Sequence, residues 1–314
     1  MAVVYDKTTF KLKSTTTPNY SLLKNDCIGC HFGTNDGTNK TPYVLSSAEP
    51  NYGTTGTGGT TTTLAGGNFY WVGNGNDSMG HNVVNITTQV SRIPPGGSVA
   101  ISQLGCAGLS GCHGDRTQSD QVRAMRQTHH PLITNADING SSPDRSYRFL
   151  NGIVGYEDSD WEFRPTTSAH NQYKGEDRAS EVTNPTDTIS HFCAICHGNF
   201  HNGSGKISST MRSPWLRHPT DFDFSNLSAG AEALSYDGDS GTGGNQYDVV
   251  VPLASSSVAS VKTNVFFSDD TIITCITCHR AHGTPFYKML RWNYASATLS
   301  TALDGCVRCH TSKN

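Results

Sequence analysis

The chain has 314 residues, of which only 16% are charged, compared with about 25% in ordinary domains. Its net charge of −3 and the absence of a basic run argue against binding to nucleic acid. No run of 18 apolar residues is present, so we expect no membrane span, and a hydrophobic content of 35% predicts only a modest core.

Polar residues dominate the first part of the chain. In residues 1–26, the alternation of apolar and charged side chains over residues 10–13 predicts a short strand. We expect residues 1–26 to form an N-terminal arm that packs on its own chain or engages in subunit contacts. Residues 51–63 are rich in Gly and Thr and predict an exposed loop.

Cysteines recur along the chain in pairs, and a histidine directly follows the second cysteine of every pair. Four pairs have Cys-x-x-Cys-His spacing, and in one stretched pair five residues separate the cysteines. All ten cysteines fall into these five groups. The groups are Cys27, Cys30 and His31; Cys106, Cys112 and His113; Cys193, Cys196 and His197; Cys275, Cys278 and His279; and Cys306, Cys309 and His310.

Cys-x-x-Cys-His is the attachment motif for c-type haem, in which both thiols bind the macrocycle and the histidine is the proximal iron ligand. Zinc ribbons also use paired cysteines but need no histidine after each pair. A disulfide framework would predict scattered cysteines. The motifs therefore predict haem c, with five haems if the stretched pair binds one. For Cys106 and Cys112, a local disulfide is the alternative.

Eight further histidines are candidates for the distal side of an iron. Residues 119–130 predict a helix that carries Val122, Met125 and His129 on one face and ends before Pro131. The eight histidines are His81, His129, His130, His170, His191, His201, His218 and His282. His170 is a reserve candidate, and His191 lies too close to its own motif to serve that haem.

The histidine count bears on mechanism. Five of the 13 histidines are proximal, and the remaining eight cover the five distal positions that five haems require. The five methionines have no obvious ligand setting, so we predict bis-histidine ligation. Both axial positions are then filled, which favours an electron carrier and no enzymatic activity. A multihaem reductase, with one open high-spin iron, is the alternative from another functional class.

Between the motifs, residues 133–190 are polar and interrupted by Pro and Gly, which disfavours long helices. Residues 248–260 predict a strand and its exit. The spacing of the motifs is irregular, so the chain is not a solenoid.

The motifs and their flanks resemble the extracellular multihaem c-type cytochrome nanowire family, of the OmcS/OmcE type. The most telling stretches are Leu-Arg-His-Pro and Cys-His-Arg-Ala-His. The matching stretches run in the same order over most of the chain. They are residues 80–83, 147–150, 193–197 with 201–202, 216–219, 275–282 and 306–310.

This resemblance implies a multihaem cytochrome c fold over residues 1–314, mostly loop or irregular with short helices and few strands, in which haems form the core. It implies one continuous haem chain and subunits joined end to end, with a histidine of one subunit able to bind a haem of the next. The implied distal ligands are His81, His201, His218 and His282, with one or both of His129 and His130.

The chain also departs from the family pattern. No histidine follows shortly after His31, where the six-haem member has one, and the haem pair that would follow is absent. The same six-haem member has an ordinary motif where Cys106 and Cys112 stand. Haem number, the pairing of distal histidines with haems and the ligand that crosses between subunits are therefore left open by the sequence.

We therefore expect a secreted or cell-surface protein, its signal peptide already removed, that transfers electrons through bis-histidine haems and polymerises head to tail into a conductive filament. Its partners would be copies of itself, redox proteins and extracellular electron acceptors. A monomeric periplasmic electron shuttle is the alternative for the same haems.

Overall fold

A computed structural model describes residues 2–6, 11–15, 27–38, 41–52, 63–87, 92–101, 103–128, 133–177, 186–201, 218, 220–227, 236 and 245–311. The side chains of residues 2–6, 11–15, 199 and 201 are not described. His129, His130, most of the Gly/Thr-rich loop and the side chain of His201 therefore lie outside the described part of the chain.

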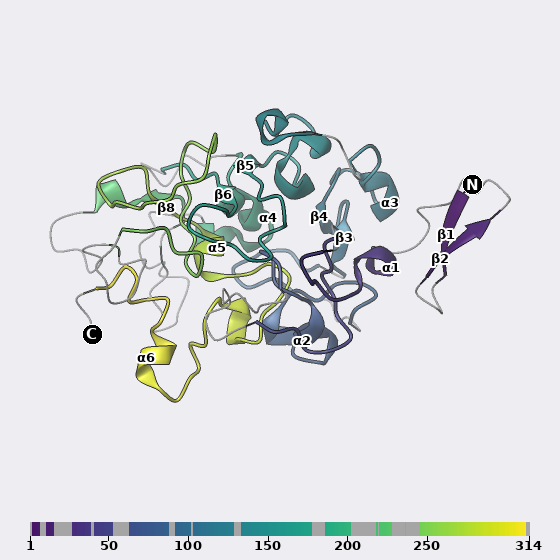
Figure 1. Cartoon of the computed structure of the whole chain (residues 1–314), viewed down its shortest axis with the longest axis horizontal. Coiled ribbons are helices and arrows are strands. Elements are labelled where there is room, and N and C mark those ends of the chain that lie inside the picture. The colour runs from purple at the N-terminus through teal and green to yellow at the C-terminus, as the bar shows by residue number, and fades with distance from the viewer. Residues whose placement is uncertain are drawn as a thin grey trace.

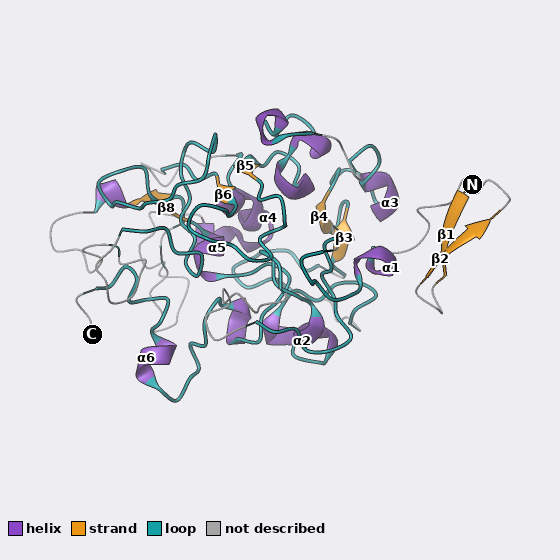
Figure 2. Cartoon of the chain, viewed as in Figure 1, coloured by secondary structure: helices purple, strands orange, loops and turns teal. Residues whose placement is uncertain are grey.

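Irregular loops make up most of the described chain, as Figure 2 shows. Among the described α-helices, only α4 has more than four residues, and it is bent at His197, where φ is −112°. The α-helices are α1 (Ile28–His31), α2 (Tyr70–Gly73), α3 (Gln121–Ala124), α4 (Ile189–His201), α5 (Cys275–Cys278) and α6 (Leu299–Ala302). The 3₁₀ helices are η1 (Asp77–Met79), η2 (Asn135–Asp137), η3 (Pro143–Arg145), η4 (Tyr147–Phe149), η5 (Phe224–Asn226) and η6 (Tyr287–Met289). The expected fold class, mostly loop with short helices and few strands, is confirmed.

Strands occur only as pairs in the described residues. An N-terminal antiparallel hairpin joins β1 (Ala2–Asp6) to β2 (Lys11–Thr15), and Figure 1 shows it at one end of the molecule. It confirms the strand expected at residues 10–13. The other pairs are β3 (Gly105–Ala107) with β4 (Gly111–His113), β5 (Gly155–Tyr156) with β6 (Gln172–Tyr173), and β7 (Phe222–Asp223) with β8 (Ile272–Ile273).

Two expected elements differ from the sequence prediction. The helix over residues 119–130 is reduced to α3, which Asp120 caps through hydrogen bonds to the N–H groups of Val122 and Arg123. Gln127 has a φ of 68°, which a right-handed helix does not accommodate. The strand expected over residues 248–260 is wrong, because Pro252 has no N–H to donate and only isolated bridges form there.

The apolar core formed by the described residues is divided into two small clusters. One gathers around Tyr247, Leu253 and Trp292, and the other around Ile153, Tyr173 and Ile189. Neighbouring residues of β8, Ile273 and Ile272, contribute to the first and the second cluster respectively. No helix in the described part of the chain is long and apolar enough to cross a membrane.

Candidate haem-binding cavity

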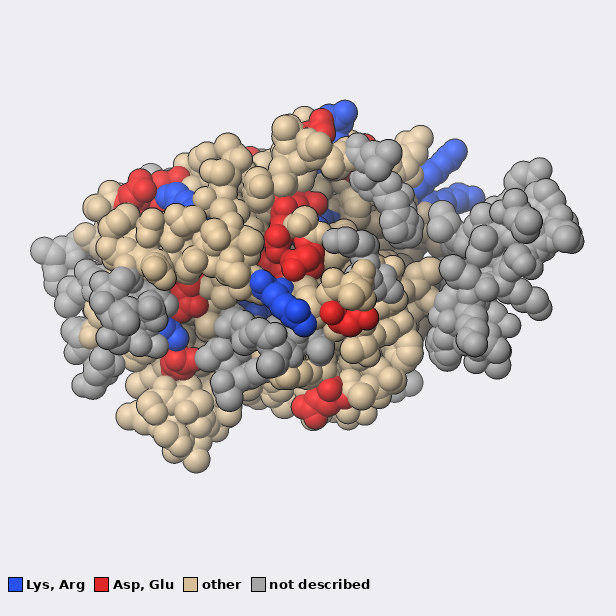
Figure 3. All heavy atoms as spheres, in the orientation of Figure 1, with Lys and Arg blue, Asp and Glu red and all other residues tan. Residues whose placement is uncertain are grey.

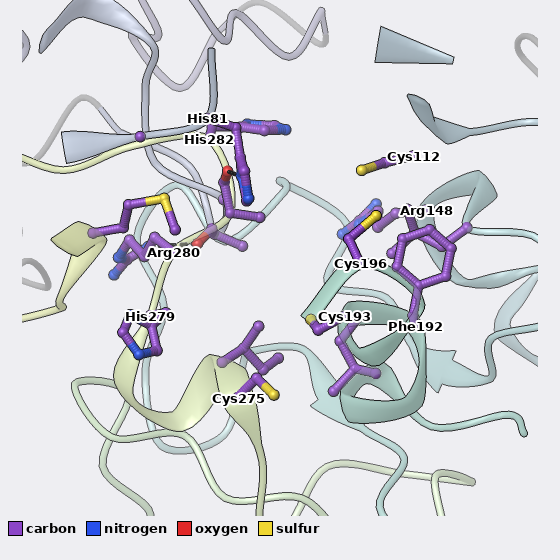
Figure 4. Close-up of a pocket in the computed structure, with 18 of the residues that line it drawn as sticks. His81, Cys112, Arg148, Phe192, Cys193, Cys196, Cys275, His279, Arg280 and His282 are labelled. Carbon is purple, nitrogen blue, oxygen red and sulfur yellow. Dashed lines mark hydrogen bonds between the residues drawn. The ribbon is translucent and has the colours of Figure 1, made fainter. Parts of the chain in front are cut away.

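One continuous cavity of about 2770 Å³ runs among these loops. Ordinary ligand pockets reach about 1,000 Å³, so this space is suited to several large groups. All ten cysteines line it, and none of them is in a disulfide. Eight histidines line it with them: His31, His81, His113, His197, His218, His279, His282 and His310. Figure 4 shows several of these side chains facing one another across the open space.

The cavity wall is largely apolar. Nine large hydrophobic side chains of the described residues are exposed, and seven of them line this cavity. They include Val99, 72% exposed, and Leu109, 61% exposed. Such a surface would be costly in water but would pack against porphyrin rings. The cavity therefore fits macrocycles that supply the apolar core missing from the sequence.

Short helical turns orient the thiols of the ordinary motifs. In α5, Thr274 and Thr277 form a capping box, which starts the turn one residue before Cys275. Cys275 and Cys278 are three residues apart and so lie on the same face of the turn. At the first and last motifs, the N–H of His31 bonds to the Cys27 carbonyl and that of His310 to the Cys306 carbonyl, each at 3.0 Å. In each case the histidine follows directly after the thiols.

The stretched motif reaches a similar arrangement by another route. β3 and β4 pair in parallel, with Gly105 opposite Gly111, so Cys106 and Cys112 lie on adjacent strands. The extra residues loop out between the strands. The N–H of Gly108, whose φ is 81°, donates to the His113 carbonyl at 3.0 Å. A Cβ on Gly111 would lie 2.5 Å from the Ala107 nitrogen, so the loop needs glycine there.

Histidine hydrogen bonds provide the clearest test of fit to haem. Four proximal histidines hold Nδ1 against a backbone carbonyl: His31 with Pro42 at 2.8 Å, His113 with Arg148 at 2.9 Å, His197 with Pro95 at 2.7 Å, and His279 with Lys288 at 2.9 Å. The distal candidate His81 does the same with Ala281 at 2.6 Å. A carbonyl can only accept, so Nδ1 carries the proton. Nε2 then has the free lone pair that a metal ligand needs.

Three histidine pairs face one another across the cavity. Ring centroids are 6.1 Å apart for His81 and His197, 6.4 Å for His113 and His282, and 6.1 Å for His218 and His310. Two imidazoles that bind one metal ion through Nε2 at about 2.0 Å have centroids roughly 6.3 Å apart. Each pair joins one proximal and one distal candidate. The residues therefore fit bis-histidine haem at three motifs, the stretched one included.

Burial lowers the pKa values of the three distal candidates in these pairs. The pKa of His282 is lowered to about 3, first by burial and then by His113, so its ring is neutral at physiological pH. Burial also lowers the pKa of His81 and, with a smaller effect from His310, that of His218. A neutral imidazole is the form that binds iron.

His170 lies away from the cavity. Its Nδ1 pairs with the Asn171 carbonyl at 2.7 Å, its Nε2 with the Lys262 carbonyl at 3.1 Å, and its ring stacks on Tyr247 at 3.8 Å. Both nitrogens are engaged and the side chain is 1% exposed, which makes this reserve candidate a structural residue.

We therefore expect His170→Ala to destabilise the protein without changing iron ligation. The substitution removes the buried imidazole that lies 2.7 Å from the Asn171 carbonyl, and the loss of a buried hydrogen-bond partner costs about 1–3 kcal/mol. Thermal unfolding should move to lower temperature while the visible spectrum stays that of the wild type. A new high-spin band would instead make His170 an iron ligand.

Sequence reasoning missed the carbonyls that hold the histidines and the buried cations beside them. Arg291 is 1% exposed, and its Nε donates to the Ile276 carbonyl, inside α5, at 2.6 Å. Arg280 is 3% exposed and donates to the Leu64 and Ala65 carbonyls. Both side chains line the cavity. Buried guanidiniums are suited to the anionic propionates of haem.

We expect Arg291→Gln to lower the reduction potential of the haem at Cys275 and Cys278. A buried positive charge opposes the extra positive charge of ferric iron, so its loss favours the ferric state. The equilibrium should shift roughly tenfold, about 59 mV for one electron. Arg291→Lys, which keeps the charge, is the control. Equal potentials in a potentiometric titration of the two variants would contradict a role for the charge.

A zinc cluster is not found in the described residues, where no three His, Cys, Asp or Glu side chains gather to hold a metal ion.

Comparison with known proteins bears on this site. A family model described as the doubled CXXCH motif matches residues 268–314, which contain the last two motifs. C-type cytochrome OmcS of Geobacter sulfurreducens is 25% identical over 319 aligned positions, covering 86% of this chain and 70% of OmcS. The structure "Outer Membrane Cytochrome S Filament from Geobacter Sulfurreducens" is matched with a TM-score of 0.45 and 22% identity, over 85% of this chain and 74% of that chain.

Proposed function

We propose that the chain is an OmcS-type multihaem c-type cytochrome with haem-binding CXXCH motifs, and that it transfers electrons through five covalently bound haems in one continuous series. The observation that carries the proposal is the single cavity that all five cysteine pairs line. Electron hopping requires haems held close together, and the protein's contribution is to place them.

Side chains of successive motifs interact in chain order. Burial lowers the pKa of His113, and the hydrogen bond to the Arg148 carbonyl opposes this shift. The nearby His31 lowers the His113 pKa further. Burial raises the pKa of Cys112 to about 11. The nearby Arg116 lowers this pKa, whereas Cys196 raises it. The thiols of Cys193 and Cys275 share a hydrogen bond. Burial and Cys306 raise the pKa of Cys278 to about 12. These neighbours support a series that runs from the first motif to the last.

Bis-histidine ligation supports electron transfer over catalysis. The three facing pairs would leave no open position on their irons. For the haems at His31 and His279, we propose distal ligands from His129, His130 and His201. An enzyme of the reductase class needs one open iron instead. Intact mass and spin state test the two functions together. Five haems with only low-spin signals support the carrier, and a native high-spin iron would favour the reductase.

We further propose that the protein is extracellular and assembles head to tail. Figure 1 places α1, which contains part of the first motif, on the side of the β1–β2 hairpin and α6, which precedes the last motif, towards the opposite side. Haems at both ends would let the series continue between subunits through a heterologous contact that does not close. Electron microscopy of the purified protein at neutral pH should show ordered filaments. Discrete particles at every concentration would favour the monomeric shuttle.

On the face shown in Figure 3, charged side chains of one sign do not form a large separate patch. Figure 3 shows acidic and basic side chains interspersed among uncharged ones.

A further inference from the structure

Two short segments, residues 147–150 and 287–290, share a sequence pattern and a backbone conformation. They read Tyr-Arg-Phe-Leu and Tyr-Lys-Met-Leu. The N–H of the leucine donates to the tyrosine carbonyl, at 2.9 Å in the first segment and 3.4 Å in the second. Both central residues have positive φ, 47° and 61° in the first and 61° and 61° in the second. We call these segments the clamp turns.

The central residues of the clamp turns are of types that rarely adopt positive φ. Positive φ at both central positions defines the type I′ turn, which strongly prefers Asn-Gly. Here the central residues are Arg148 and Phe149, and Lys288 and Met289. Long side chains are strained in this conformation and stay there only where the surroundings hold them. Nine non-glycine residues of the described chain have positive φ, and four of them are in the clamp turns.

Each clamp turn aims two successive carbonyls at one haem motif. His113 Nδ1 lies 2.9 Å from the Arg148 carbonyl oxygen, and the Gly114 N–H donates to the Phe149 carbonyl at 2.7 Å. His279 Nδ1 lies 2.9 Å from the Lys288 carbonyl oxygen, and the Arg280 N–H donates to the Met289 carbonyl at 3.0 Å. The proximal histidine and the residue after it are thus held together at both sites.

We propose that the clamp turns are positioning elements for the proximal histidines of the haems at His113 and His279. This inference rests on the proposed function, because it assigns a role toward haems. It adds that the strained backbone fixes the imidazole ring and its tautomer and thereby sets the potential of those two haems.

The contact with histidine distinguishes these turns from a third pair of consecutive positive-φ residues. Trp161 and Glu162 have φ values of 66° and 57°, but the Trp161 carbonyl accepts the Ala65 N–H. His31 and His197 use carbonyls of Pro42 and Pro95 instead. At two motifs, therefore, a Tyr-basic-x-Leu segment provides the carbonyls that bind both the proximal histidine and the residue after it.

The direction of the effect follows from ligand basicity. A hydrogen bond from Nδ1–H to a carbonyl makes the imidazole a stronger donor to iron. A stronger donor stabilises the ferric state and lowers the potential. Loosening the turn should weaken the hydrogen bond and raise the potential of the haem it serves.

Lys288 allows a charge-matched test, because its side chain is exposed and its Nζ lies over the Tyr287 ring, at 4.9 Å from the centroid. Lys288→Gly, Lys288→Ala and Lys288→Val all lose one charge but differ in tolerance of positive φ. Intact mass first confirms equal haem loading. Potentiometric titration should then show one haem whose ferric–ferrous equilibrium favours the ferrous state at least threefold more in Lys288→Val than in Lys288→Gly, about 28 mV. Lys288→Ala should lie between them.

Asn85→Val is the matched control. Asn85 is exposed, has a φ of 69° and has no contact with a proximal histidine among the hydrogen bonds of the described residues. It should lose stability without a change in potential. Equal potentials in the loaded Lys288 variants would overturn the inference and leave the proposed function intact. If the Lys288→Val protein does not accumulate, the difference in potential between Lys288→Gly and Lys288→Ala tests the inference instead. A wild-type protein without haem would instead overturn the proposed function.

Discussion

His282→Ala should convert one iron of the loaded protein from low-spin to high-spin while every haem stays covalently attached. His282 is the distal candidate that faces His113, with ring centroids 6.4 Å apart. Alanine has no donor atom, so the iron at the stretched motif would lose its sixth ligand. The absorption spectrum should show a high-spin contribution from one haem, and intact mass should match that of the wild type apart from the substitution.

Two further variants sharpen this test. His282→Met offers a thioether in place of the imidazole and should keep the iron low-spin at a higher potential, because methionine ligation raises haem potential. His170→Ala removes a buried histidine that faces no partner across the cavity and should leave the spin state unchanged. A fully low-spin His282→Ala protein would contradict the pairing of His282 with His113.

The double variant Cys106→Ser and Cys112→Ser should lose one haem and interrupt electron flow. In the proposed series, the stretched motif would be second of five, between the first motif and the motif at Cys193. Edge-to-edge transfer depends steeply on distance, so a missing interior haem should slow end-to-end transfer far more than a change in one potential. Intact mass counts the haems, and conductance of the assembled protein measures the flow.

A variant that lacks the haem at the end of the series is the matched control. Cys306→Ser with Cys309→Ser also removes one haem but leaves the first four sites in order. It should affect contacts between subunits more than transfer within one subunit. If the Cys106 and Cys112 variant retained the wild-type haem number, the stretched motif would not bind haem.

The haem attachment motifs are the part of the site that the sequence alone can name, because covalent attachment depends on residues that are neighbours in the chain. The pairing of ligands depends on tertiary structure instead. His81 faces His197 across more than a hundred residues, and only the folded loops bring them together. His170 illustrates the same limit, since its two carbonyl partners, on Asn171 and Lys262, could not be read from its local sequence.

Secondary structure was harder to predict because short-range patterns compete with packing around the cavity. Val122 and Met125 do show helical spacing, yet both line the cavity and the helix ends within one turn. The apolar run at Val250 and Val251 joins a buried cluster as a loop. The clamp turns were visible in the sequence only as the stretch at residues 147–150, and their positive φ values contradict ordinary turn preferences.

A high-resolution cryo-electron microscopy map of the purified holoprotein would show the haems and their ligands directly. We predict five haems in one unbroken series in chain order, with His81 and His197, His282 and His113, and His218 and His310 on opposite sides of three irons. Four haems, a gap within the series or different histidine pairs at these irons would contradict this prediction.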